Sequence, residues 1–84
     1  MSYQLRHKEF GIYQGSCLGL GFWYPLSDMP EQGFCEFPSY SEAMEYLRFL
    51  CSDECDDPLN PIDLSIEPYD KEMSERLIKR GARQ

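Results

Sequence analysis

The feature that most constrains the fold is an amphipathic stretch over residues 37–51 that carries its own start signal. Ser39 and Glu42 have the spacing of a capping box, and Pro38 disfavours extension of a helix toward the N-terminus. At ~100° per residue, the apolar residues that follow share one face. They are Tyr40, Ala43, Met44, Leu47, Leu50 and Cys51. The stretch therefore predicts a helix whose apolar face the rest of the chain must cover.

Two aromatic residues of this predicted helix lie away from the apolar face. Phe49 falls almost opposite it, and Tyr46 lies beside Phe49. Two interpretations stay open. In so small a domain, another part of the chain can cover Phe49. Alternatively, Tyr46 and Phe49 form an exposed surface for a partner.

Five further segments have the pattern of extended chain, and a second helix follows them. The segments are residues 3–9, 12–14, 17–24, 34–37 and 62–67. The last of these alternates strictly between apolar and polar residues and is bounded by Pro61 and Pro68. Asp70 is expected to cap a helix over residues 71–80, which ends at Gly81.

This order of elements, β-β-β-β-α-β-α, predicts an α+β fold. We expect one small domain over residues 1–84, with a frayed tail at 82–84, built on an antiparallel sheet of four to five strands. The central helix is expected to pack on one sheet face, and the C-terminal helix to close or leave open the other. The predicted core comprises Leu5, Ile12, Leu18, Leu20, Phe22, Leu47, Leu50, Leu64 and Ile66. Tyr13 and Trp23 are expected on the opposite face.

Glycines interrupt one face of the predicted strand over residues 17–24. Leu18, Leu20, Phe22 and Tyr24 share one face, whereas the other is Cys17, Gly19, Gly21 and Trp23. Because glycine weakens a strand, something should exploit the missing side chains. One interpretation is that an aromatic ring of an adjacent strand, such as Tyr13, lies over the bare strip. The other is a shallow groove floored by glycine and walled by Trp23.

The chain carries a formal net charge of −7 that is concentrated in its middle. From Glu9 to Asp70 there are thirteen carboxylates and one basic residue, Arg48. Such a body repels nucleic-acid phosphates, so direct DNA or RNA binding is not expected. The acids are suited to attracting a basic protein partner; the alternative is that they only keep the protein soluble.

The most acidic segment, residues 52–61, lacks the pattern of a calcium-binding loop. Cys51 and Cys55, which flank its start, could occupy two zinc positions if they share a helical face. Two further ligands would have to come from irregularly spaced residues, and no redox Cys-x-x-Cys motif occurs. We therefore expect no metal and no cofactor.

The sequence also lacks the usual signs of export and of catalysis. No apolar run reaches the ~18 residues that cross a bilayer. The N-terminus lacks the apolar segment of a signal peptide. We therefore expect a cytoplasmic protein with reduced cysteines and no membrane partner. His7 is the only histidine, and no activated nucleophile is apparent, so we do not expect an enzyme.

These observations favour a small intracellular, non-catalytic binding or regulatory protein that acts on a protein partner. Exposed aromatics would anchor the interface and carboxylates would steer a basic partner toward it. The predicted interface comprises Trp23, Tyr24, Tyr46, Phe49, Asp53, Glu54, Asp56 and Asp57. Three alternatives stay open: a nucleic-acid mimic that inhibits a DNA- or RNA-binding protein, a metal or redox site at Cys51 and Cys55, and a structural subunit that forms a homodimer.

Overall fold

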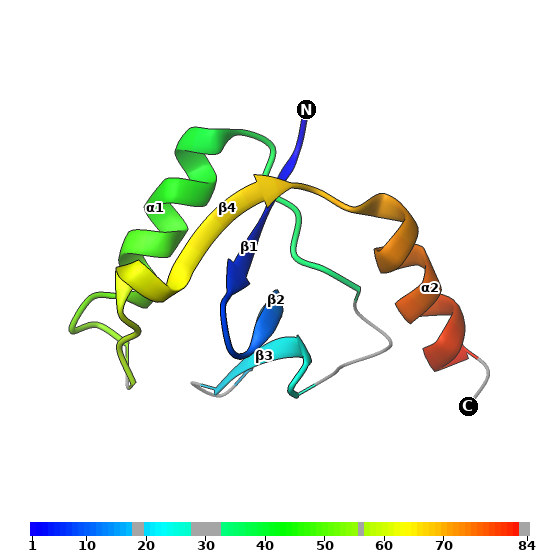
Figure 1. Cartoon of the computed structure of the whole chain (residues 1–84), viewed down its shortest axis with the longest axis horizontal. Helices are drawn as coiled ribbons and strands as arrows, with labels where there is room; N and C mark the ends of the chain where they lie inside the picture. Colours follow the sequence, from blue (N-terminus) through cyan, green and yellow to red (C-terminus); the bar gives the residue numbers. More distant parts are fainter. Residues whose placement is uncertain (18–19, 28–32, 56, 83–84) are drawn as a thin grey trace.

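Four antiparallel strands in one sheet and two helices make up the protein in a computed structural model that describes residues 1–17, 20–27, 33–55 and 57–82 (Figure 1). The elements are β1 (Tyr3–His7), β2 (Gly11–Cys17), β3 (Leu20–Pro25), α1 (Tyr40–Leu50), the 3₁₀ turn η1 (Pro61–Asp63), β4 (Leu64–Pro68) and α2 (Lys71–Ala82). The α+β class and the predicted arrangement of sheet and helices are thus confirmed.

The sheet has the order β3-β2-β1-β4, so the last strand of the sequence lies beside the first. β4 pairs with β1 along its whole length, from Tyr3 opposite Pro68 to His7 opposite Leu64. The short strand expected at residues 34–37 is reduced to one bridge, in which Tyr3 and Phe37 exchange two backbone hydrogen bonds of 2.8 Å. The backbone of β1 therefore pairs with three separate parts of the chain.

The strand predicted at residues 62–67 begins two residues later than expected. Asn60 accepts a hydrogen bond from the backbone N–H of Ile62 through its side chain, at 3.1 Å from Oδ1 to N. Pro61 follows at the first helical position, where its fixed φ favours a helical turn. Residues 61–63 consequently form η1, and Ile62 is 80% exposed.

The predicted central helix is present as α1, from Tyr40 to Leu50. Ser39 is its N-cap, and its Oγ accepts a hydrogen bond of 3.2 Å from the backbone N–H of Glu42. The side chains of Ala43, Leu47 and Leu50 are buried. The helix contacts β1 and β4, so it covers one face of the sheet near β4 (Figure 1).

Tyr13 and Trp23 lie in the core beneath α1, which corrects the prediction that they occupy the opposite sheet face. The register decides the faces, because directly paired residues of neighbouring strands share one face. Ile12 pairs with Arg6 and with Tyr24, which places it on the face opposite Leu5. The main core comprises Leu5, Tyr13, Trp23, Phe37, Ala43, Leu47, Leu50 and Leu64.

Several predicted core residues therefore have other positions. Ile12 belongs to a second cluster with Phe34 and Leu77. Ile66 is partly buried against the main core, and Phe22 is half-buried opposite Gly15, where the β2–β3 register shifts at a bulge. Leu18, Gly19 and the side chains of Cys17 and Leu20 lie outside what the structure describes.

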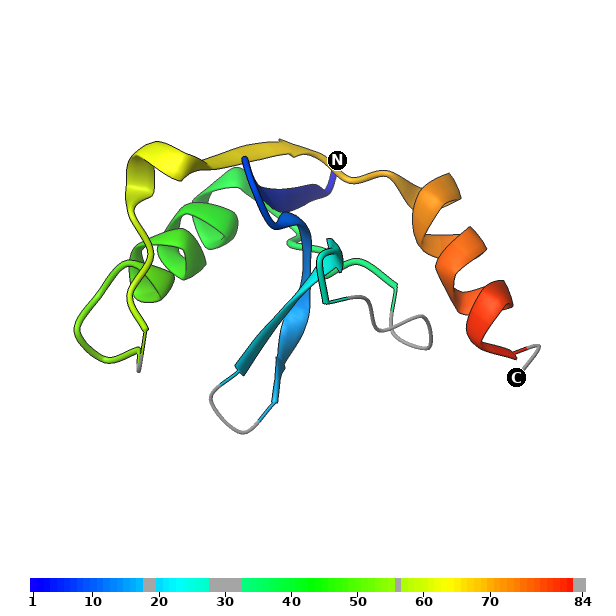
Figure 2. The same ribbon diagram turned by 60° about the horizontal axis from the view of Figure 1, so that its bottom comes forward.

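Helix α2 packs against the second cluster, on the other side of the β2–β3 hairpin from α1 (Figure 2). Leu77 is buried there, and Ser74 Oγ accepts a hydrogen bond of 3.1 Å from the backbone N–H of Phe34. The start of the helix is fixed to β1, because Gln4 Oε1 accepts a hydrogen bond of 2.8 Å from the backbone N–H of Asp70. Of the expected tail, residues 83–84 lie outside the described residues. None of the helices described is long and apolar enough to cross a membrane.

Candidate functional site

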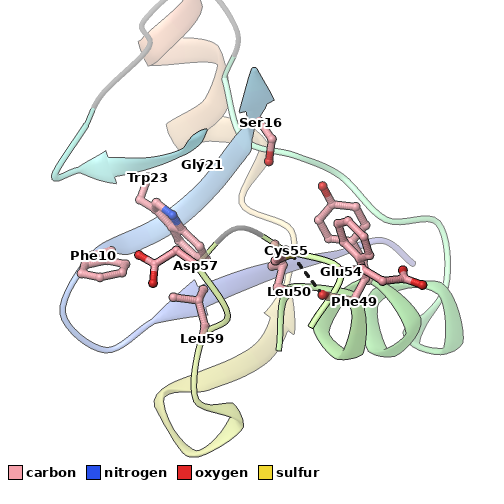
Figure 3. A pocket seen from close by; sticks show the side chains of 11 residues that line it. Phe10, Ser16, Gly21, Trp23, Phe49, Leu50, Glu54, Cys55, Asp57 and Leu59 are labelled. Atoms are coloured by element: carbon pink, nitrogen blue, oxygen red, sulfur yellow. Dashed lines mark hydrogen bonds between the residues drawn. The ribbon is translucent and has the colours of Figure 1, made fainter. Parts of the chain in front are cut away.

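A cavity of about 350 Å³ opens between α1, the segment that follows it and the β2–β3 hairpin (Figure 3). Its aromatic lining consists of Phe10, Trp23, Tyr46 and Phe49. Its carboxylates are Glu54 and Asp57. The remaining lining residues are Ser16, Gly21, Leu50, Cys55 and Leu59. The cavity therefore combines aromatic rings with negative charge.

Trp23 forms the sheet side of the cavity. It is only 5% exposed, which corrects the expectation of an exposed side chain, although part of it still borders the cavity. Its ring contacts those of Tyr13 and Phe10 edge-to-face, with centroids 4.9 Å and 5.9 Å away. A Cβ on Gly21 would lie 3.1 Å from Trp23 Nε1. The bare glycine position thus leaves room for the indole.

Tyr46 and Phe49 form the opposite side, on α1. The Tyr46 hydroxyl lies 2.7 Å from the hydroxyl of Tyr13, and Tyr46 also contacts Phe49, with ring centroids 5.7 Å apart. Phe49 remains 42% exposed. Of the two interpretations of Phe49, the structure therefore supports an exposed side chain rather than one covered by the chain.

Phe49 also borders a second, more open hollow of about 390 Å³ on its other side. Phe37, Pro38 and Tyr46 line this hollow, together with the carboxylate residues Glu42 and Glu45. Phe49 and Tyr46 are common to both hollows. The exposed phenyl ring thus borders two hollows, each of which is lined by a pair of carboxylate residues.

The segment after α1 is held against the end of the helix by hydrogen bonds to its last carbonyl groups. Ser52 Oγ and Cys55 Sγ both donate to the carbonyl oxygen of Phe49, at 2.7 Å and 3.1 Å. The backbone N–H of Leu59 donates to the carbonyl oxygen of Leu50 at 2.9 Å. These bonds satisfy carbonyls that the helix leaves free, and they hold the loop that brings Glu54 and Asp57 to the cavity.

The two cavity carboxylates are not neutralised within the described part of the chain. The ion pairs there join Arg6 to Glu67, Lys8 and His7 to Asp63, and Lys71 to Glu75. No hydrogen bond or ion pair among those described residues engages the carboxylate of Glu54 or Asp57. Their charge consequently stays available to a ligand.

The eight residues of the predicted interface divide into three groups. Trp23, Tyr46, Phe49, Glu54 and Asp57 line the cavity together. Tyr24 lies on the opposite face of the sheet, near Phe34, and is not part of it, whereas Asp53 is exposed but outside the lining. Asp56 lies outside the described residues. Phe10 and Leu59 were not predicted, because contacts from distant segments bring them to the cavity.

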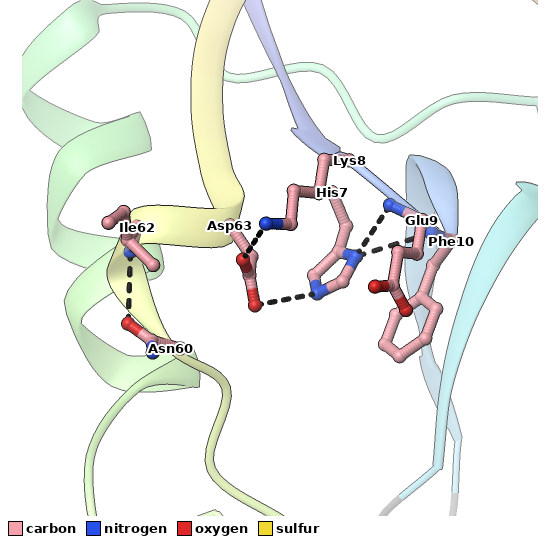
Figure 4. Close-up of polar contacts among 7 residues, drawn as sticks. All are labelled: His7, Lys8, Glu9, Phe10, Asn60, Ile62 and Asp63. Atoms are coloured by element: carbon pink, nitrogen blue, oxygen red, sulfur yellow. Dashed lines mark hydrogen bonds and ion pairs between the residues drawn. The ribbon is translucent and has the colours of Figure 1, made fainter.

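His7 supports the turn that carries Phe10 (Figure 4). Its Nδ1 accepts hydrogen bonds from the backbone N–H groups of Glu9 and Phe10, at 3.1 Å and 3.2 Å. Its ring stacks on Phe10 with centroids 3.9 Å apart, and its Nε2 lies 3.9 Å from Asp63 Oδ2. Because Nδ1 accepts both bonds, the neutral ring carries its proton on Nε2. The histidine thus has a positioning role beside the cavity.

Cys35 and Cys51 lack the environment of an activated nucleophile. Cys35 and Cys51 are free thiols. Burial raises the pKa of Cys35; burial, and then the neighbouring Cys55, raise the pKa of Cys51. A raised pKa keeps a thiol protonated at neutral pH. Among the described residues, no group of three or more His, Cys, Asp or Glu side chains could hold a metal ion.

The fold and the cavity together define a small α+β protein with an aromatic, acidic cavity beside its central helix. Comparison of the chain with protein-family models, with curated proteins and with solved structures finds no match.

Proposed function

We propose that the protein is a small, non-catalytic binding or regulatory protein that engages a basic protein partner through the face around this cavity. One observation carries the proposal: five residues predicted to form an interface, from three segments of the chain, line the same cavity. Aromatic side chains are frequent anchors of interfaces, and complementary charge raises the rate and selectivity of association.

The charge of the chain supports a basic partner over other classes. With a net charge of −7 the protein repels nucleic acids and attracts positively charged surfaces. The available carboxylates of Glu54 and Asp57 line the same cavity as the exposed Phe49, so attraction and anchoring coincide in one cavity. In this proposal the acids contribute to recognition as well as to solubility.

The proposal includes the absence of catalysis and a location in the cytoplasm. The raised pKa values of Cys35 and Cys51 disfavour thiolate chemistry, and the Nδ1 of His7 is engaged with the backbone. The free thiols of Cys35 and Cys51 agree with a reducing compartment.

Binding of short, unstructured, lysine-rich peptides tests this function. The anisotropy of a fluorescent label on the peptide should report a complex whose Kd increases as the ionic strength rises to about 0.15 M, because exposed charges are screened. A peptide of the same length and opposite charge is the control. Equal affinity for both peptides, or an affinity for the basic peptide that salt does not change, would contradict the proposal.

A further inference from the structure

We propose that the cavity receives one arginine side chain of the partner, with its guanidinium against the aromatic wall and its N–H groups on Glu54 and Asp57. This inference rests on the proposed function and deepens it, because it names the group that the cavity selects. The argument depends on the walls of the cavity, its charge, its size and its rigidity.

The walls favour a planar, weakly hydrated cation. Aromatic rings attract cations through their negative faces, and a guanidinium also stacks on them. Figure 3 shows Trp23, Phe10 and Asp57 close together on one side of the cavity and Phe49 and Glu54 on the other, with Leu50 and Cys55 between them. A ligand in the cavity would therefore contact rings and a carboxylate at once.

The charge excludes the other small-ligand classes. An anion would be repelled by Glu54 and Asp57, and a neutral apolar group would cover these carboxylates without pairing them, which is unfavourable. A guanidinium instead donates several hydrogen bonds from N–H groups whose fixed, planar arrangement matches the two oxygens of a carboxylate. Lysine supplies the same charge, but its ammonium is more strongly hydrated. It therefore loses more hydration free energy on entering a cavity with aromatic and aliphatic walls.

The size and the rigidity of the cavity fit a single long side chain. Its volume of about 350 Å³ is near the lower end of the ~300–1,000 Å³ typical of small-ligand pockets. Tyr46 is held by the hydroxyl of Tyr13, and the loop of Glu54 is held by the hydrogen bonds of Ser52 and Cys55 to Phe49. Such preorganisation reduces the entropy lost on binding.

The test compares three peptides that differ at one central position within the same lysine-rich sequence: arginine, lysine and citrulline. Citrulline has nearly the shape of arginine but no charge, and lysine has the charge but not the planar fork. We expect the arginine peptide to bind roughly tenfold more tightly than the lysine peptide, because a stacked, charge-assisted pair is gained at equal net charge. Trp23, the only tryptophan, borders the cavity, so its fluorescence should change with the arginine peptide.

Two variants with the same change of charge localise the effect. Glu54→Gln removes a carboxylate of the cavity. Asp53→Asn removes the carboxylate of the neighbouring residue, which is exposed and does not line the cavity. Glu54→Gln should abolish most of the preference for arginine over lysine, and Asp53→Asn should retain it. Phe49→Ala should also lose the preference, with Tyr40→Ala on the same helix as its control, since Tyr40 is exposed outside the cavity.

The outcomes separate this inference from the function on which it rests. If all basic peptides bind with salt dependence but arginine has no advantage, the arginine pocket is wrong and the acidic interface stands. If Glu54→Gln and Asp53→Asn lost the preference for arginine over lysine equally, only general electrostatic attraction would remain. The proposed arginine pocket would then be wrong. If no basic peptide binds, both proposals are wrong.

Discussion

The hydroxyl of Tyr46 on α1 lies 2.7 Å from the hydroxyl of Tyr13 on β2. Tyr13 is fully buried in the main core, and its hydroxyl is also hydrogen-bonded to Ser16. The pair therefore joins the helix to the middle of the sheet at the inner edge of the cavity. Tyr46 is fixed by this bond, whereas its neighbour Phe49 remains exposed.

Removing the Tyr46 hydroxyl should weaken the protein modestly. In Tyr46→Phe the Tyr13 hydroxyl keeps Ser16 as a partner, so the free energy of unfolding should fall by only about 0.5–1.5 kcal/mol. Tyr13→Phe removes both bonds and should lower it further. Urea denaturation measures both values. A double variant as stable as Tyr13→Phe alone would confirm that Tyr46 acts through Tyr13, whereas fully additive losses would contradict it.

The burial of Tyr13 predicts a loss of stability in alkali. Burial is the largest cause that raises its pKa above the ordinary value of 10.0. The neutral phenol is thus favoured in the folded state, and the stability it contributes is present below pH 10 and declines as the pH rises above it. The absorbance of phenolate should include a step, due to Tyr13, that appears only well above pH 10 or on unfolding. Absence of this step from the wild type, or its persistence in Tyr13→Phe, would contradict the burial.

The pKa values of other groups are raised as well, so a variant is needed to isolate the contribution of Tyr13 to the pH dependence of stability. The pKa of Lys8 is raised by its bond to Asp63, and those of Cys35 and Cys51 are raised by burial. Each therefore also gives stability that declines at high pH. In Tyr13→Phe, measured over the same pH range as the wild type, only the part of the decline in stability that is due to Tyr13 should be missing.

Two glycines of the cavity region should differ sharply in their tolerance of alanine. Gly11 has φ +104°, and a Cβ there would lie 1.7 Å from the carbonyl oxygen of Tyr24, which is backbone. Gly11→Ala should therefore lower the free energy of unfolding on the order of 3 kcal/mol, from strain and overlap together. At Gly21 the nearest atom, Trp23 Nε1, is at 3.1 Å and belongs to a side chain.

Gly21→Ala should accordingly fold and act as the matched control. In this variant the fluorescence of Trp23 should change, because the indole must shift to admit the methyl group. Thermal unfolding and emission spectra of the two variants test this pair. Similar stability of both variants would show that the turn at Gly11 does not impose the conformation described.

The general fold could be predicted because its signals are local. The N-cap of Ser39 and the periodicity after it define α1, and the alternation before Pro68 defines most of β4. The faces of the first strands could not be assigned, since they depend on register. The pairing of Arg6 with Ile12 and the bulge after Tyr13 decide that Tyr13 and Trp23 meet α1. Alternation within each strand carries no information about which face turns to the helix.

The site could be predicted only where residue type was sufficient. Tyr46 and Phe49 were recognisable because they are aromatic residues that lie away from the apolar face of the helix, and Glu54 and Asp57 because they belong to a run of acids. Phe10 reaches the cavity through the hydrogen bonds of His7, and Leu59 through its bond to Leu50. Such long-range contacts leave no pattern in a single sequence. Alternation puts Tyr24 and Trp23 on opposite faces of their strand, but only the register shows that Trp23 is the one on the cavity side.

His7 provides a test of how Phe10 is held at the cavity. In His7→Leu the backbone N–H groups of Glu9 and Phe10 lose their acceptor in a partly buried position, so the free energy of unfolding should fall by about 1–3 kcal/mol. Lys8→Met breaks the exposed pair with Asp63 and should have a much smaller effect. Urea denaturation compares the two variants. A larger loss in Lys8→Met would mean that Asp63, rather than the turn, is the important partner.

Phe49 should contribute little to stability, in contrast to its helix neighbour Leu47. Leu47 is buried in the main core, and Leu47→Ala should lower the free energy of unfolding by about 2–5 kcal/mol, since it leaves a cavity. Phe49→Ala truncates a side chain that is 42% exposed between two hollows, so the loss should stay below about 1 kcal/mol. Urea denaturation of both variants gives the comparison. If Phe49→Ala proved as destabilising as Leu47→Ala, the ring would be a structural part of the core, and its exposure beside four carboxylates would no longer argue for a binding role.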